Sequence, residues 1–392
     1  MSLRDQVEQV LRGWNAYEVN RGASPVIDFD CFPAEADTEP AENRLAVYRA
    51  LSELRAQATG GLADRVDADL AYLRALLGER ADLADYVRAT QGCHVAGWPE
   101  EYVTERGAQA RSALESLGVG WDAHTATAMD EAEEPIDAEE APEAIRQAAA
   151  EYEPAVRQAT GTHAPYSLTI ETADVDAYWA YWLDGAGDQV RLRLNSRNSR
   201  FTKVSARQFA LHEVLGHGLQ SASLTAQAAG DVPWVRLLSI HAPHQVMLEG
   251  LAQAMPLFVA PDDEILTARV RLDHYAQLVR AELHLAINRG ASIDACARHA
   301  RERVPWWSES AIANLLSDRG ANVLLRSYLW AYPAGIDWFA ALSQADARVI
   351  KEVLHAAYRA PLTPADLATL WPDGPPIGGP GGAVRLRKPA VP

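Results

Sequence analysis

The segment ALHEVLGHGLQ, residues 210–220, contains two histidines, His212 and His217, that lie five positions apart. On a regular α-helix each residue turns by about 100°, so side chains five apart differ by about 140° and point in different directions. A widened turn, or π-bulge, brings such positions onto one face, and Gly216 has the backbone freedom that a widened turn requires. The sequence therefore predicts a helix that is widened between His212 and His217.

The residues before this segment indicate where the helix begins. Ser205 and Gln208 have the spacing of a capping box. An apolar stripe follows, at Phe209, Leu211 and Leu215. We therefore expect the helix to begin at Ser205 and to hold both histidines in its interior.

The residue types in this helix are those of a metal centre in which two histidines bind the ion and a glutamate, here Glu213, activates water. A catalytic zinc ion usually takes three protein ligands. In HAPHQVMLEGLAQAMPLF, residues 241–258, Glu249 is a carboxylate in the middle of an apolar helix, where it needs a partner such as a metal ion. We predict a Zn²⁺ site formed by His212, His217 and Glu249, with Glu213 as general base.

Four other side chains compete for a place in this centre. His241 and His244 lie at a loop and a first helical turn, where helix capping or surface exposure is expected. Glu282 and His284 are weaker candidates as ligands, but either could hydrogen-bond to a ligand histidine and fix its tautomer.

The distribution of apolar residues predicts a mainly α fold of many helices with a small antiparallel β element before the motif helix. We expect an N-terminal helical region at 1–128, an acidic linker or helix at 129–160, a catalytic region at 161–360 and a Pro/Gly-rich tail at 361–392, extended or disordered. YSLTIETA, around residues 165 to 172, and QVRLRLNS, residues 189–196, are predicted to form an antiparallel strand pair.

The net charge, the cysteines and the apolar runs of the chain indicate which partners and which location to expect. The net charge of −17 argues against nucleic acid or an anionic membrane as a partner. Three cysteines far apart, together with a start that lacks a signal-peptide pattern, favour a cytoplasmic protein, and no apolar run approaches the roughly 20 residues of a membrane span. The oligomeric state is not indicated.

With HEVLGHGLQ, EGLAQ and SYLWAYPAGIDWF identified, the chain resembles a bacterial family of zinc-metallopeptidase-like proteins over about residues 160–345. The motifs of that family are His-Glu-x-x-Pro-Gly-His-x-x-Gln, Glu-Gly-Trp-Ala and a late Tyr-Lys-x-Gly. The present chain lacks the motif proline and has Leu251 in place of the Trp. Its five-residue histidine spacing with a preceding Gly is similar to that of dipeptidyl peptidase III.

The resemblance implies a zincin-like fold of the glutamate-zincin type, with His212, His217 and Glu249 as zinc ligands and Glu213 as base. Gln220 and Asn195 match further motif positions. Tyr332, or Tyr328 one turn earlier, is implied to stabilise the oxyanion.

The expected function is a zinc-dependent peptidase acting on a peptide or small amide substrate. The strand pair before the motif helix supports this, since an extended peptide can add to a strand edge. A metal-dependent enzyme of another reaction type, or a non-catalytic descendant of the scaffold, remain the alternatives.

Overall fold

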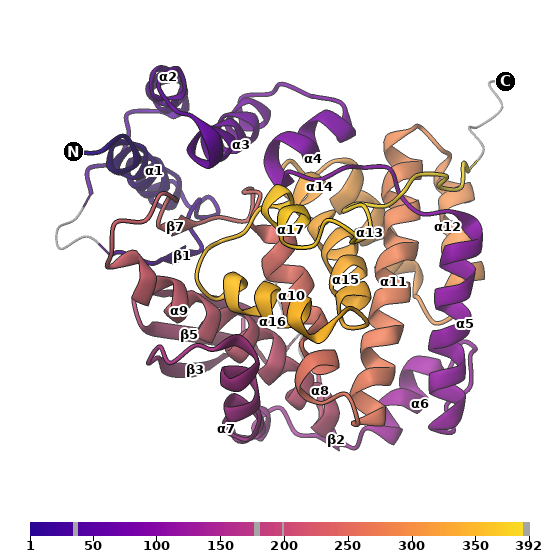
Figure 1. Cartoon of the computed structure of the whole chain (residues 1–392). Helices are drawn as coiled ribbons and strands as arrows, with labels where there is room; N and C mark the ends of the chain where they lie inside the picture. The colour runs from indigo at the N-terminus through magenta and orange to yellow at the C-terminus, as the bar shows by residue number, and fades with distance from the viewer. Residues whose placement is uncertain (34–37, 176–180, 198–199, 387–392) are drawn as a thin grey trace, which may run out of the picture.

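The computed structural model describes residues 1–33, 38–175, 181–197 and 200–386. In these ranges the protein is mainly helical with a small sheet, which confirms the predicted fold class. Figure 1 shows the N-terminal helices at one corner, the sheet below them, and long helices packed side by side through the rest of the molecule. None of the helices in the described ranges is long and apolar enough to cross a membrane.

The N-terminal part is helical, as predicted, and several of its helices begin at a capping side chain. Ser2 and Asn43 accept hydrogen bonds from the first-turn amides of the helices that follow them. Leu11, Trp14 and Leu51 are fully buried in a core shared by the first three helices. The helices are α1 (Leu3–Asn20), α2 (Arg44–Arg55), α3 (Gly60–Leu76), α4 (Leu83–Gln91), α5 (Glu100–Ser116) and α6 (Thr125–Ala132).

The acidic segment 129–160, predicted as a linker or a helix, is mostly helical. Helix α7 (Ala141–Thr160) places its acidic residues on an exposed face and buries Ile145 and Val156 in the main core. This segment is therefore a structural helix of the main body.

The main sheet has the strand order β3-β5-β4-β1-β7. The prediction of an antiparallel pair from residues 165–172 and 189–196 is wrong, because these segments pair in parallel. The antiparallel partner of β5 is β4, a strand that lies between these two segments in the sequence. The strands are β1 (Phe29–Asp30), β3 (Ser167–Ala173), β4 (Tyr181–Ala186), β5 (Gln189–Asn195) and β7 (Leu237–Leu238), with β2 (Pro135–Ile136) and β6 (Phe201–Thr202) in a second sheet.

The motif helix follows β6 directly. Its first part, α8 (Lys203–Phe209), has Thr202 as the capping residue and Ser205 at the third helical position, so the predicted start at Ser205 is wrong by one turn. Both hydroxyls of this capping box are used, since each accepts a hydrogen bond from the other residue's amide. The π-helical segment η1 (Ala210–Gly218) comes next, and α9 (Leu219–Ala228) completes the helix. The predicted widened turn is confirmed.

Helix α10 (Gln245–Val259) lies in the centre of the molecule and packs against η1, α11 and α15. Its residues from Gln245 to Pro256 are all buried. Gly250 of α10 meets Gly335 of α15 (Ala331–Leu342), where a Cβ on Gly335 would lie 2.4 Å from the Val246 carbonyl oxygen. The two glycines thus let the two backbones touch, which brings the tyrosines near α15 towards Glu249.

We predict that Gly335→Ala lowers the free energy of unfolding by about 3 kcal/mol or more, because backbone atoms of α10 cannot move aside for a methyl group. Gly61→Ala is the matched control, since a Cβ at Gly61 meets nothing within 4 Å. Urea unfolding of both variants measures the difference. Equal stabilities would show that the crossing of α10 and α15 is looser than described.

The C-terminal half is helical, as predicted, but the tail is more ordered than expected. Residues 361–386 include helix α17, the buried residues Leu362 and Ile377, and backbone hydrogen bonds to residues 94–97. Of the two predicted alternatives, extended or disordered, disorder is therefore wrong for these residues. The rest of the predicted tail, 387–392, lies outside the described residues. The remaining helices are α11 (Glu264–Asn288), α12 (Ile293–Arg303), α13 (Glu309–Gly320), α14 (Leu325–Tyr328), α16 (Ala347–Ala357) and α17 (Pro364–Leu370).

Candidate metal centre

The widened turn brings the two motif histidines together. The Nε2 atoms of His212 and His217 lie 3.2 Å apart, and both rings face the same cavity. Gly216 has a different role from the predicted one, because its backbone is helical and a Cβ there would lie 2.8 Å from the Cβ of Ala252. Its small size lets η1 pack against α10.

Glu249 projects from α10 towards both histidines. Its Oε2 atom lies 3.6 Å from His212 Nε2 and 3.7 Å from His217 Nε2. This oxygen is buried and has no hydrogen-bond partner in the described structure. Two imidazole nitrogens and an unpartnered carboxylate oxygen therefore form a triangle of potential ligand atoms.

The triangle has the dimensions of a zinc site. Tetrahedral zinc bound at 2.0–2.2 Å to nitrogen and oxygen holds its ligand atoms about 3.3 Å apart. The observed separations of 3.2, 3.6 and 3.7 Å are close to this value. An unpaired carboxylate oxygen in a buried position is costly, and a cation at the centre of the triangle would offset that cost.

Glu213 lies beside the triangle. Its Oε1 atom is 3.6 Å from His212 Nε2, and His212, Glu213 and His217 together also form a group that could hold a metal ion. Glu249 Oε2 is nearly equidistant from both histidines, so we assign Glu249 as the ligand and Glu213 as the neighbouring acid–base group. Burial raises the pKa of Glu213, although the nearby His212 and His217 oppose this shift.

The charges of the cluster determine the pKa values of its members. Burial disfavours the charged form of His212, but contact with Glu249 and the charge of Glu213 outweigh burial and raise its pKa. Burial likewise disfavours the ionised form of Glu249, yet the two histidines outweigh it and lower the pKa of this carboxyl. Glu249 is therefore an ionised carboxylate ready to bind a cation.

Two tyrosines complete the centre. The Tyr328 hydroxyl donates a hydrogen bond of 2.5 Å to Glu249 Oε1. The hydroxyls of Tyr328 and Tyr332 lie 2.8 Å apart, and because the proton of Tyr328 is used by the carboxylate, Tyr332 donates to Tyr328. Burial and the charge of Glu249 raise both tyrosine pKa values, so both hydroxyls stay protonated. Tyr328 orients the predicted ligand Glu249, and Tyr332 lines two cavities beside the cluster.

The centre lies between two hollows. A cavity of about 560 Å³ and another of about 370 Å³ share Tyr181, His212, Glu213 and Tyr332 in their walls. These four residues therefore stand between the two hollows.

The competing residues have other roles. His241 and His244 are buried, so the expectation of surface exposure is wrong, and His241 Nε2 is 2.8 Å from Asp69 Oδ1. The side chain of His244 accepts a hydrogen bond from the Ser239 amide and does not cap α10. Both histidines thus belong to the polar core beneath the N-terminal helices.

Glu282 and His284 do not contact the ligand histidines, so the suggestion that they fix a ligand tautomer is wrong. Glu282 binds His299 and Arg303, and His284 Nε2 is 2.9 Å from the Arg326 carbonyl oxygen. They connect α11 to its neighbours.

Gln220 and Asn195 form structural hydrogen bonds. The amide of Gln220 is buried and donates to the Ala357 carbonyl oxygen, which ties the motif helix to α16. Asn195 ends β5 and donates to the Val175 carbonyl oxygen.

The wall formed by the N-terminal segment and β4 was not predicted from the sequence. Ser24, Pro25 and Asp28 face Tyr181 and Trp182 across the larger of the two hollows. The available signal was DFD at residues 28–30, an acidic pair around an apolar residue within a short β-like run. Nothing in the sequence pattern linked that run to the motif helix.

Comparison with known proteins gives the fold alone. No protein-family model matches the chain, and no curated protein matches it. A solved structure of a "putative lipoprotein" from Colwellia psychrerythraea is similar, with a TM-score of 0.54 at 16% identity over 83% of this chain. The match spans 59% of the length of that protein.

Proposed function

We propose that this protein is a zinc-dependent peptidase. The observation that carries the proposal is the triangle of His212 Nε2, His217 Nε2 and the unpartnered Glu249 Oε2, with a buried Glu213 beside it. The geometry is also compatible with the resemblance to zinc-metallopeptidase-like proteins. A cytoplasmic location stays a prediction, supported by three buried, unpaired cysteines.

When bound, a zinc ion supplies Lewis-acid polarisation of a carbonyl group and lowers the pKa of water. Glu213 accepts a proton from the water that adds to the substrate carbonyl carbon. It then passes that proton to the leaving nitrogen as the carbon–nitrogen bond breaks. Its raised pKa suits both steps, since a base poised nearer neutral pH can also act as an acid. Tyr332 turns its hydroxyl from Tyr328 to the oxyanion that develops on the carbonyl oxygen.

A peptide is the favoured substrate because part of β4 offers an unpaired edge. Strand β1 pairs with β4 only at Gly185 and Ala186, on the side opposite β5. Among the described residues, Tyr181–Leu183 have no strand partner on that side, and they line the cavity that holds the metal centre. An extended peptide can hydrogen-bond along this edge.

The test is hydrolysis of a mixed pool of synthetic peptides by the purified, zinc-loaded protein, with new termini identified by mass spectrometry. A sample treated with a chelator is the control. We expect cleavage that needs the metal. Intact peptides after prolonged incubation with zinc-loaded, folded protein would contradict a peptidase function.

The two tyrosines are expected to differ in effect. Tyr328→Phe removes the donor that orients Glu249 and should weaken zinc binding by about 10- to 100-fold. Tyr332→Phe should leave zinc affinity unchanged and lower kcat, by about 100-fold if it stabilises the oxyanion. Zinc titration with a competing chelator and steady-state kinetics measure both effects. The reverse pattern would exchange the two assigned roles.

A further inference from the structure

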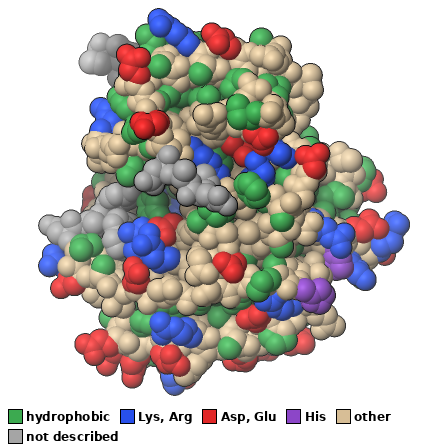
Figure 2. Space-filling model, turned by 90° about the vertical axis from the view of Figure 1, so that its left-hand side faces the viewer, with side chains coloured by type: hydrophobic (Ala, Val, Ile, Leu, Met, Phe, Trp, Pro, Cys, Tyr) green, Lys and Arg blue, Asp and Glu red, His purple; other side chains and the backbone are tan. Residues whose placement is uncertain are grey.

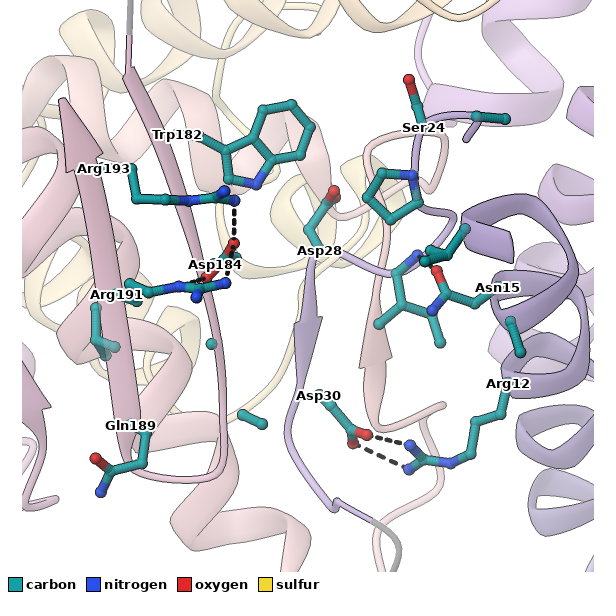
Figure 3. Close-up of a pocket in the computed structure, with 18 of the residues that line it drawn as sticks. Arg12, Asn15, Ser24, Asp28, Asp30, Trp182, Asp184, Gln189, Arg191 and Arg193 are labelled. Atoms are coloured by element: carbon teal, nitrogen blue, oxygen red, sulfur yellow. Dashed lines mark hydrogen bonds and ion pairs between the residues drawn. The ribbon is translucent and has the colours of Figure 1, made fainter. Parts of the chain in front are cut away.

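A larger cavity adjoins the metal centre. It has a volume of about 1100 Å³ and lies between α1, β1 and the strands β4 and β5. Ser24, Pro25, Asp28 and Trp182 line both this cavity and the one that holds the metal centre. Figure 3 shows Asp28 on the segment leading into β1, with its carboxyl group between Trp182 and Ser24. Asp28 thus lies where this larger cavity meets the cavity that holds the candidate metal centre.

Asp28 differs from the other aspartates of this cavity. Asp30 pairs with Arg12, and Asp184 lies 2.8 Å from Arg191 and 2.6 Å from Arg193 (Figure 3). Asp28 has no ion pair within the described part of the chain, and its Oδ2 atom is buried without a hydrogen-bond partner.

The arginine whose charge acts on Asp28 already has other partners. Arg65 reaches Asp28 only through longer-range attraction, because its guanidinium group is bound to Asp69 and to Ser239. Burial raises the pKa of Asp28 to about 8, with Arg65 opposing the shift and Glu249 adding to it. Ionising a buried carboxyl group that has no partner costs free energy. A cation that a ligand brings beside the carboxyl group offsets that cost.

The strands indicate where such a ligand ends. From Gly185 onwards, β1 occupies the edge of β4, and Asp28 stands immediately before β1. A peptide paired with Tyr181–Leu183 cannot continue along the edge of β4 beyond the point where β1 occupies that edge. One end of the peptide, or a side chain near that end, therefore meets the Oδ2 atom of Asp28, which has no hydrogen-bond partner, while the carboxyl group also interacts with the Ile240 backbone.

The exposed face does not select charge by itself. In Figure 2, acidic and basic side chains are interspersed over the visible surface and no single sign dominates it. The surface in this view therefore gives no reason to prefer a substrate of one charge.

We propose that Asp28 binds an ammonium group of the peptide substrate, either its amino terminus or a lysine side chain, and so fixes where the chain is cut. This inference rests on the proposed peptidase function. Because β1 ends the free edge of β4 beside Asp28, a chain terminus is expected there, and a carboxylate selects the amino terminus over the carboxyl terminus. The protein would then remove short pieces from the start of a peptide.

The test compares three peptides that differ only in their ammonium groups. One has a free amino terminus and no lysine, one is acetylated without lysine, and one is acetylated with a lysine. Zinc-loaded wild-type protein, Asp28→Asn and Asp30→Asn are assayed on each. Asp30→Asn is the matched control, because that aspartate lines the same cavity with an arginine partner.

We expect kcat/KM for the free peptide to exceed that for the acetylated, lysine-free peptide by about 10- to 100-fold, the value of a hydrogen bond to a charged group. Asp28→Asn should remove this preference and Asp30→Asn should keep it. Recovery of cleavage in the acetylated peptide with lysine would identify the side chain as the bound group. Equal cleavage of all three peptides, or an Asp28→Asn variant that keeps the preference, would overturn the assignment of Asp28 while leaving the peptidase function intact. If none of the three peptides is cleaved, both the assignment of Asp28 and the proposed peptidase function are refuted.

Discussion

Replacement of Glu213 by glutamine is expected to lower kcat by about 10²- to 10⁴-fold while the protein keeps its zinc. The amide has the same shape as the carboxylate, but it cannot accept a proton from water at neutral pH. Glu213 is buried beside the two histidines, and burial raises its pKa while the histidines oppose this shift. Steady-state hydrolysis of a cleaved peptide, together with the zinc content of the variant, measures the effect.

This variant also separates the classes of function considered for the chain. A structural metal site has no need for a base, so a non-catalytic protein would lose nothing in Glu213→Gln. If Glu213→Gln keeps wild-type kcat, the assigned base is wrong even if hydrolysis is real.

The second large effect is expected at the ligand from α10. Glu249→Gln should weaken zinc binding by at least about 100-fold, because a ligand matters at least as much as the groups that orient ligands. The side chain keeps its size, and Tyr328 can still donate to its remaining oxygen, so the fold should be preserved. Chelator competition gives the zinc affinity, and circular dichroism checks the fold.

Unchanged zinc affinity in Glu249→Gln would move the third ligand position to Glu213. The two carboxylates are otherwise comparable candidates for the third ligand, since each has an oxygen 3.6 Å from His212 Nε2. The assignment of Glu249 rests on its equal approach to both histidines.

Much of this centre could be predicted from sequence because its signals are local. The five-residue spacing of His212 and His217 allows chelation only on a widened helix, and η1 has that form. Glu249 was identifiable because a carboxylate among apolar helix residues needs a partner. Each of these two inferences depends only on residues that lie within a single helix.

The remaining features depend on contacts between distant segments. Alternation along a strand gives its faces but neither its neighbours nor its direction, so the parallel pairing of β3 with β5 was not predictable from pattern. Asp28 reaches the site from the position just before the two-residue strand β1, about 180 residues before His212. The division of roles between Tyr328 and Tyr332 follows from one hydrogen bond to Glu249.

The most direct test of the account is the zinc content of the purified protein by elemental mass spectrometry, measured beside His217→Ala and His163→Ala. His163 is an exposed histidine and serves as the control. We predict about one zinc per chain in the wild type and in His163→Ala, and none in His217→Ala. Folded wild-type protein that holds no zinc and cannot be reconstituted, or a His217→Ala variant that retains a full equivalent, would contradict the metal centre.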